Sequence, residues 1–256
     1  MNSHLKFNFK KKYGQHFLNN EDVAINIIKF LEFQTYKQVI EVGPGTGVLT
    51  KYIVKKCKPI LIEIDEEAIE FLKKNVTNIQ KIISGDFLKI NLKNYLKNPT
   101  LIIGNFPYNI STQILFKILK HKDDIITIVG MFQKEVADRI CSKPNSKKYG
   151  ISSVLIQAYY NCRIILHVAS KNFTPPPKVE SSVIEFKRNK TKKLNCNEEN
   201  FFQVVKLSFN QRRKKIKNSL KLFSFQKDRN IIELLEKRAE QLSVIDFVNL
   251  TNKIIR

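Results

Sequence analysis

The stretch Leu101-Ile102-Ile103-Gly104-Asn105-Phe106-Pro107-Tyr108 changes from apolar to polar character at a single residue. Its first four residues are typical of a short buried strand, and Asn109-Ile110-Ser111-Thr112 just beyond it is typical of a helix start. An amide, a proline and an aromatic ring therefore meet where a strand ends. In open α/β sheets, ligands bind at the carboxyl ends of the strands. We expect this stretch to line a binding site.

Four further apolar runs repeat the strand-then-helix pattern. In chain order these predicted strands cover residues 38–42, 60–64, 81–83 and 125–132. Helical spacing of apolar residues covers 21–33, a stretch ending near Cys57, then 66–75 and 111–121. Strands that alternate with helices at this spacing indicate a parallel sheet. Residues 156–168 and 179–187 are rich in β-forming residues, and we expect them to pair antiparallel at the sheet edge.

Composition changes again near residue 190. The segment Arg188-Asn189-Lys190-Thr191-Lys192-Lys193 is a basic linker, and from about Glu198 the apolar residues recur at helical spacing to the end. We therefore predict three parts. They are a disordered basic arm at 1–12, an α/β domain at 13–189 and a small all-helical domain at 190–256.

The charge of the chain points to a polyanionic partner. Lys and Arg number 45 against 23 Asp and Glu, a formal net charge of +22. Such an excess favours nucleic acid as the partner, although a lysine-rich genome composition also raises the charge. The four cysteines are far apart, without metal-ligand spacing, so we expect no metal site and reduced thiols in a cytoplasmic protein. No apolar run reaches the roughly 18–20 residues of a membrane span, so we expect no membrane partner.

Three strand ends carry residues suited to an adenosine-type ligand. The turn Gly43-Pro44-Gly45-Thr46-Gly47 follows a strand, and its glycines let a ligand approach the next helix. Its spacing matches neither the dinucleotide fingerprint nor a P-loop. Glu63 comes about 20 residues after Gly43, where an acid grips ribose hydroxyls, and Asp86 is placed to accept a hydrogen bond from an adenine amine. Taken singly, these are a tight turn, a solvated carboxylate and a cap residue; together they leave a methyltransferase and a dehydrogenase open.

The stretch at Asn105 separates these alternatives. An exocyclic adenine amine is a poor nucleophile because its lone pair is conjugated with the ring. The Asn105 side-chain oxygen and the Pro107 main-chain carbonyl can each accept one N–H of that amine, and the Tyr108 ring can stack on the base. Positioning and electrostatics then supply most of the catalysis, without a strong general base. In isolation these four residues would be a turn; after the other three motifs they indicate transfer of a methyl group.

An ordered set of motifs along nearly the whole chain resembles the ribosomal RNA adenine N6,N6-dimethyltransferase family. The motifs are Tyr13-Gly14-Gln15-His16-Phe17-Leu18, Glu41-Val42-Gly43-Pro44-Gly45-Thr46-Gly47, Asn105-Phe106-Pro107-Tyr108-Asn109-Ile110-Ser111, Gln133-Lys134-Glu135-Val136-Ala137-Asp138-Arg139, Phe173-Thr174-Pro175-Pro176-Pro177-Lys178-Val179 and Phe209-Asn210-Gln211-Arg212-Arg213-Lys214. The family often has Asn where this chain has His16, and Leu where it has Phe106.

The resemblance implies S-adenosyl-L-methionine as cofactor. It implies that His16 and Leu18 contact the cofactor, that Gly43 and Gly45 form its glycine turn, and that Glu63 holds its ribose. By the same resemblance Asp86 holds the cofactor adenine and Asn105 lies at the point of methyl transfer.

The resemblance also implies contacts with RNA. Phe173 would supply a second stacking face for a flipped adenine, a step that such enzymes need; alone it would be a core residue. Gln211-Arg212-Arg213-Lys214-Lys215-Ile216-Lys217 is expected to open a helix. Arg212, Arg213 and Lys214 on it would contact phosphates, although a bare charge run is more typical of a solvated helix face.

Together these features predict a class I methyltransferase fold, a mostly parallel seven-stranded sheet with helices on both faces, and a C-terminal helical domain. The predicted enzyme dimethylates N6 of two adjacent adenines near the 3′ end of small-subunit rRNA, within a pre-ribosomal subunit and as a monomer. One alternative is the sister enzyme that modifies large-subunit rRNA and confers macrolide resistance. Another is a ribosome-assembly factor that binds RNA without catalysis.

Overall fold

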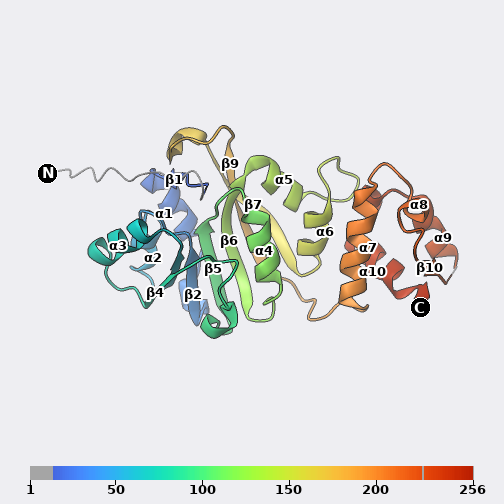
Figure 1. Cartoon of the computed structure of the whole chain (residues 1–256), viewed down its shortest axis with the longest axis horizontal. Coiled ribbons are helices and arrows are strands. Elements are labelled where there is room, and N and C mark those ends of the chain that lie inside the picture. The colour runs from blue at the N-terminus through green and yellow to red at the C-terminus, as the bar shows by residue number, and fades with distance from the viewer. Residues whose placement is uncertain (1–13, 227, 256) are drawn as a thin grey trace. The chain divides into compact units, whose positions relative to one another are not determined.

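The computed structural model describes residues 14–226 and 228–255. Contacts divide the chain into two units, one of residues 1–137 and 163–187 and the other of residues 138–162 and 188–256 (Figure 1). The basic arm predicted at 1–12 lies outside the described residues, as does Tyr13.

A seven-stranded sheet forms the centre of the first unit. The end residues of its last two strands group with the second unit. Its strands are β2 (Gln38–Val42), β3 (Ile60–Glu63), β4 (Lys81–Ser84), β5 (Thr100–Asn105), β6 (Ile125–Gln133), β7 (Tyr160–Val168) and β9 (Ser181–Arg188). The spatial order is β4-β3-β2-β5-β6-β9-β7. Strands β4 to β6 pair parallel and β9 runs antiparallel to β6. The predicted mostly parallel, seven-stranded α/β sheet is therefore confirmed.

The strand order reverses its direction between β2 and β5. From β2 the chain continues to β3 and β4 on one side, whereas β5 and β6 lie on the other side. Such a switch point opens a crevice at the carboxyl ends of the strands, because the connections leave in opposite directions. The glycine turn after β2 and the Asn105 motif at the end of β5 flank this crevice.

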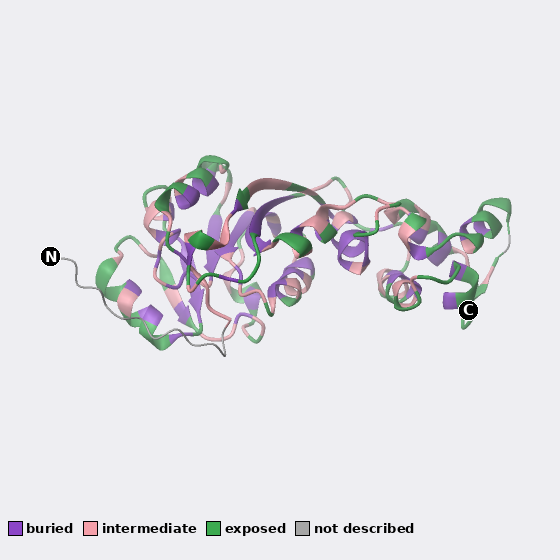
Figure 2. Ribbon diagram, turned by 90° about the horizontal axis from the view of Figure 1, so that it is seen from above, coloured by how far each residue is buried: buried purple, intermediate pink, exposed green. Residues whose placement is uncertain are grey.

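The central strands form because most of their side chains are apolar on both faces. All five residues of β2 are buried, as are the first five of β5. Figure 2 shows buried residues, in purple, along the strands of the sheet. Alternate residues such as Val39 and Leu101 join one cluster with helix α1 (Glu21–Lys29), and their neighbours Ile40 and Ile102 are fully buried on the opposite face. Both faces of these strands are thus covered, as expected for a parallel sheet.

The helices of the first unit follow the predicted positions. They are α1, α2 (Thr50–Ile53), α3 (Glu66–Asn75) and α4 (Ser111–Leu119), with 3-10 turns η2 (Phe33–Thr35), η3 (Leu92–Tyr95) and η4 (Ser170–Asn172). Helix α3 has the predicted bounds, and the other helices are shorter than predicted. The prediction of helix to residue 33 was wrong, because Phe30 caps α1 and Phe33 belongs to the separate turn η2. Likewise α2 stops at Ile53 and not near Cys57. Asp65 caps α3, its carboxylate accepting from the Glu67 N–H at 3.2 Å.

Two short strands tie the start of the described chain to a distant loop. β1 (Phe17–Leu18) pairs antiparallel with β8 (Phe173–Thr174), and Leu18 lies opposite Phe173. Asn19 adds a main-chain hydrogen bond of 2.9 Å to the Asn172 carbonyl. The amino-terminal segment is thereby fixed to the loop after β7.

The second unit is largely helical. Helix α5 (Lys134–Cys141) ends in it, and it contains α6 (Ile151–Gln157), α7 (Glu198–Asn210), α8 (Ile216–Ser219), α9 (Arg229–Glu236), α10 (Val244–Asn252), the turn η5 (Ala239–Gln241) and the small strands β10 (Ser224–Phe225) and β11 (Ile254–Ile255). The sequence predicts a domain boundary at 189–190. In the structure, residues 138–162 also group with the second unit, because α6 packs on α7 and α10.

One predicted strand in this region was wrong in part. Ile156 belongs to α6, and the strand begins only at Tyr160. A short apolar run fits a buried helix as well as a strand. Here the Ser153 hydroxyl accepts the Gly150 N–H at 3.0 Å and starts a helix. Within residues 14–226 and 228–255, every helix is too short or too polar to cross a lipid bilayer.

Candidate functional site

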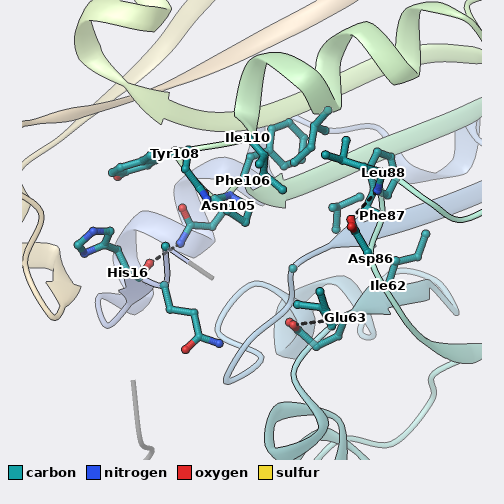
Figure 3. Close-up of a pocket in the computed structure, with 18 of the residues that line it drawn as sticks. His16, Ile62, Glu63, Asp86, Phe87, Leu88, Asn105, Phe106, Tyr108 and Ile110 are labelled. Carbon is teal, nitrogen blue, oxygen red and sulfur yellow. Dashed lines mark hydrogen bonds between the residues drawn. The ribbon is translucent and has the colours of Figure 1, made fainter. Parts of the chain in front are cut away.

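A cavity of about 220 Å³ opens at the carboxyl ends of β2, β3, β4 and β5, where the strand order reverses (Figure 3). All of its walls belong to the first unit. The lining residues are Gly14, Gln15, His16, Phe17, Val42, Gly43, Ile62, Glu63, Ile64, Gly85, Asp86, Phe87, Leu88, Asn105, Phe106, Pro107, Tyr108, Asn109, Ile110 and Ile114. The cavity therefore brings together segments that are far apart in the sequence.

Most of the predicted site residues line this cavity. Those in its walls are His16, Gly43, Glu63, Asp86, Asn105, Pro107 and Tyr108. Leu18, Gly45 and Phe173 are not in its walls. Leu18 and Phe173 are buried in the hydrophobic cluster of the first unit, with exposed fractions of 4% and 2%.

The glycine turn leaves room beside Asn105. Gly43 has a φ of +68°, and a β-carbon placed on it would lie 3.7 Å from the Asn105 main-chain oxygen and 4.0 Å from Pro107 Cδ. A side chain at residue 43 would therefore project into the gap between the two motifs. Gly45 has a different role, because a β-carbon there would lie 2.4 Å from the Phe17 ring. Glycine at residue 45 lets the amino-terminal segment cross close to the turn.

Glu63 is held rigidly at the end of β3. One carboxylate oxygen accepts the Gly45 N–H at 3.0 Å, and the other accepts the N–H groups of Ile64 and Asp65 at 2.8 and 3.0 Å. Burial raises the pKa of Glu63, and these three donors oppose that shift. The carboxylate therefore ties the glycine turn to β3 and presents fixed acceptor atoms to the cavity.

Asp86 begins a tight turn just after β4, the strand that neighbours β3. Its Oδ1 accepts the Leu88 N–H at 2.8 Å, drawn as a dashed line in Figure 3, and its main-chain oxygen accepts the N–H groups of Lys89 and Ile90. Among the described residues, no hydrogen bond reaches the second carboxylate oxygen of Asp86. That oxygen is available to accept a hydrogen bond from a bound ligand.

The amide of Asn105 has a defined orientation. Its nitrogen donates to the His16 main-chain carbonyl at 2.7 Å (Figure 3). A carbonyl can only accept, so the NH₂ end of the amide must face His16. The side-chain oxygen of Asn105 therefore points elsewhere, and it is the acceptor that the residue can offer in the cavity. Sequence reasoning expected this acceptor but could not identify the His16 contact that aims it.

Pro107 and Tyr108 are also fixed by neighbours. The Pro107 carbonyl accepts the Ile110 N–H at 3.1 Å. The Tyr108 hydroxyl is hydrogen-bonded to the Ser181 hydroxyl at the start of β9, and burial raises the pKa of Tyr108. The His16 ring stacks on Tyr108 with a centroid distance of 5.5 Å and an angle of 25°. The tyrosine hydroxyl therefore stays protonated, and the ring keeps one orientation.

His16 joins three parts of the site. Its main-chain carbonyl holds Asn105, its ring covers Tyr108, and its Nδ1 lies 2.8 Å from the Pro175 carbonyl. Since that carbonyl can only accept, Nδ1 carries the proton and donates. His16 therefore links the amino-terminal segment, the Asn105 motif and the loop after β7.

Glu41 is a buried acid that sequence reasoning did not select. It lies in β2 two residues before Gly43 and is 1% exposed. Burial, reinforced by the nearby charge of Glu63, raises the pKa of Glu41 to about 8. Its Oε2 has no hydrogen-bond partner among the described residues. The signal in the sequence was an acid between the apolar residues Ile40 and Val42 of a buried strand.

The basic residues predicted to contact RNA lie in the second unit, in a turn between α7 and α8. The prediction that they open a helix was wrong, because α7 ends at Asn210 and α8 begins at Ile216. Arg213 and Lys214 are exposed. Arg212 instead donates to Glu240 at 2.7 Å and to the carbonyls of Ser146 and Lys147. Its guanidinium is therefore engaged within the unit.

Comparison with known proteins identifies the family. A family model described as ribosomal RNA adenine dimethylase matches residues 6–256. The chain belongs to this family. The resemblance of the motifs is thereby confirmed over nearly the whole chain of this rRNA adenine dimethylase.

Named relatives agree with that assignment. A ribosomal RNA small subunit methyltransferase A from Cytophaga hutchinsonii is 48% identical over 253 residues, covering 97% of this chain and 98% of the relative. The crystal structure of a dimethyladenosine transferase from Plasmodium falciparum matches with a TM-score of 0.79 at 24% identity, covering 92% of this chain and 96% of the other. The 23S rRNA methyltransferase ErmE matches with a TM-score of 0.68 at 22% identity, covering 93% and 100%.

These findings confirm the predicted fold and enzyme class. Both solved structures share the class I methyltransferase fold, and at their identities they show the fold alone. The family and the relative named for the small subunit favour the small-subunit prediction over the large-subunit and non-catalytic alternatives. The chain is an rRNA adenine dimethylase, an enzyme rather than a passive assembly factor.

Proposed function

We propose that this adenine dimethylase uses S-adenosyl-L-methionine to dimethylate N6 of two adjacent adenines near the 3′ end of small-subunit rRNA. Its substrate is the rRNA within a pre-ribosomal subunit, and the enzyme acts as a cytoplasmic monomer. The family and the small-subunit relative support the choice of RNA. The assignment of the residues rests on the geometry of the cavity.

The walls of the cavity suit an adenosyl cofactor. Glu63 offers fixed carboxylate oxygens for ribose hydroxyls at one strand end, and Asp86 offers an acceptor for the adenine amine at the next. Gly43 keeps the gap towards Asn105 clear of any side chain. His16 and Phe17 close the cavity from the amino-terminal side. When bound, S-adenosylmethionine supplies an electrophilic methyl group carried on its sulfonium.

The orientation of Asn105 is the observation that carries the proposal. Because its NH₂ group donates to His16, its oxygen is the atom that accepts an N–H of the substrate amine. The Pro107 carbonyl already accepts one main-chain N–H and retains a second lone pair for the other N–H of the amine. Two acceptors orient the nitrogen lone pair and favour its pyramidal form, which lowers the barrier through preorganised electrostatics.

The aromatic residues hold the flipped base. Tyr108 lies in the cavity wall, with its hydroxyl fixed by Ser181, so we assign stacking on the adenine to Tyr108. Phe173 is buried beside Leu18, and a stacking role for its ring requires β8 to move. On the second unit, Arg213 and Lys214 are the exposed cations that we assign to phosphate contacts, with Arg212 supporting the turn that carries them.

Methylation of isolated subunits tests the function. The full chain is incubated with labelled S-adenosylmethionine and either small or large subunits from cells that lack this modification. Modified bases are then mapped by primer extension. We expect label only in the small subunit, at two adjacent adenines near the 3′ end. Label in 23S rRNA with none in the small subunit would overturn the proposal.

A further inference from the structure

Lys117 lies outside the cavity wall but contacts the turn that forms one side of it. It belongs to α4, the helix that starts just after the Asn105 motif. Its ammonium group donates to the Leu88 carbonyl at 2.9 Å and also to the Ile90 carbonyl. Two of its three N–H donors are therefore used on a single turn.

The same ammonium group interacts with the side chains of that turn. It lies 5.6 Å from the centre of the Phe87 ring, which is buried and lines the cavity. Partial burial lowers the pKa of Lys117, and attraction to Asp86 opposes that shift. The Lys117 ammonium group therefore contacts both the main chain of this turn and the buried ring of Phe87.

A chain of hydrogen bonds connects Lys117 to the Asp86 carboxylate. The Leu88 carbonyl accepts from Lys117, and the Leu88 N–H donates to Asp86 Oδ1 at 2.8 Å. The main-chain position of Leu88 therefore sets the rotation of the Asp86 carboxylate. That rotation decides where the remaining oxygen of Asp86 lies in the cavity.

We propose that Lys117 is a positioning residue that gives the cofactor site its specificity for adenine, by holding the turn that orients Asp86. The inference rests on the proposed function, in which Asp86 accepts a hydrogen bond from the adenine amine. A carboxylate that is fixed in place rejects hypoxanthine, which has a carbonyl oxygen where adenine has the amine, because two acceptors then face each other. A carboxylate that is free to rotate loses this discrimination.

The test compares two ligands that differ at that one atom. Dissociation constants for S-adenosylhomocysteine and S-inosylhomocysteine are measured by calorimetry on the full chain, for the native protein and for Lys117→Met. The Met side chain keeps an unbranched apolar stem but removes the ammonium group. We expect binding of S-adenosylhomocysteine to weaken about tenfold and binding of the inosine analogue to change little. The ratio of the two constants therefore falls by a similar factor.

Three further variants are measured in the same experiment. Lys120→Met removes an exposed cation from the end of the same helix and is expected to leave the ratio unchanged. Lys117→Arg keeps a cation with several donors and is expected to restore most of the ratio. Lys117→Gln keeps an amide donor, disturbs the turn less than Met and is expected to give an intermediate ratio, so it serves if the Met variant does not fold.

The outcomes separate this inference from the proposed function. If the native protein does not bind S-adenosylhomocysteine, or does not prefer it over the inosine analogue, the assigned cofactor site is wrong. If the native protein does discriminate and both Lys117→Met and Lys117→Gln keep the native ratio, the positioning role is wrong. Equal weakening of both ligands would assign Lys117 a purely structural role and would also overturn the inference.

Discussion

The side-chain amide of Asn105 donates to the main-chain carbonyl of His16 over 2.7 Å. This contact orients the side-chain oxygen of Asn105, the atom that we propose accepts an N–H of the substrate amine. The contact is made by the main chain of His16, so it does not depend on the identity of that side chain. An Asn at residue 16, as is common in the family, would preserve it.

Replacement of Asn105 by Asp should abolish most of the activity. The Asp carboxylate has no N–H to donate, so one of its oxygens would face the His16 carbonyl and the side chain would rotate or move. We expect kcat to fall about 100-fold or more, with RNA binding within about twofold of native. Single-turnover methylation and filter binding measure the two effects. Native turnover by Asn105→Asp, or by Asn105→Ala, would contradict the assigned role.

Replacement of Glu41 by Gln should remove a pH dependence of stability. The pKa of Glu41 is about 8 in the folded chain and 4.5 as an ordinary glutamate, so the folded state binds this proton more tightly. The free energy of unfolding therefore falls as pH rises between about 4.5 and 8, by up to about 1.4 kcal/mol per pH unit. Denaturant unfolding at pH 5, 6.5 and 8 should show this loss in the native chain. The Gln variant, measured at the same three pH values, should not show this loss. If the free energy of unfolding changes with pH in the same way in both proteins, the pKa of Glu41 lies near its ordinary value.

We expect Phe173 to contribute mainly to the stability of the fold, and a role in catalysis to be tested separately. Its ring is 2% exposed and packs in the core beside Leu18. Phe173→Ala should lower the free energy of unfolding by about 3–5 kcal/mol. Phe173→Leu keeps most of the volume and should cost less than about 1.5 kcal/mol. Activity of the stable Leu variant then tests the ring alone: a large loss of kcat would support stacking on the base, and native kcat would leave Phe173 as a core residue.

The exposed cations after α7 should differ from Arg212 in their effect on RNA binding. The double variant Arg213→Gln, Lys214→Gln removes the two cations that we propose contact phosphates, so the slope of log K against log salt should shrink by about 2. Arg212→Met should instead lower the melting temperature and leave the slope nearly native, because its guanidinium bonds Glu240 and two carbonyls. Lys29→Gln, on the other unit, controls for net charge. If the salt slope changes in the Arg212→Met variant and stays native in the double variant, the roles assigned to these residues are reversed.

The ends of the strands could be predicted because the residues that mark them are adjacent in the sequence. An apolar run that stops at a glycine or a polar residue is visible in the sequence, and parallel strands bring such ends to one edge of the sheet. For that reason the sequence alone could assign Gly43, Glu63, Asp86 and Asn105 to one site. The family resemblance added His16, whose own residue type gave no such signal.

Contacts between distant segments were not predictable. The pairing of Leu18 with Phe173 involves strands of two residues each, too short for any periodic pattern. The ion pair of Arg212 with Glu240 was equally unpredictable, because a run of basic residues does not show which of them has an acidic partner. The contact of Lys117 with two carbonyls depends on the path of a turn rather than on residue type.

The hydrogen bond between His16 and Pro175 has a consequence for protein synthesis, because its partners are 159 positions apart. At about 5–20 residues per second, a ribosome needs roughly 8 to 30 seconds to travel between them. The ribosome has therefore already synthesised β2, β3, β4 and β5, which carry most of the cavity wall, before His16 can form its hydrogen bond with Pro175. Chains truncated before residue 175 should keep the glycine turn yet lack the contact that completes the site.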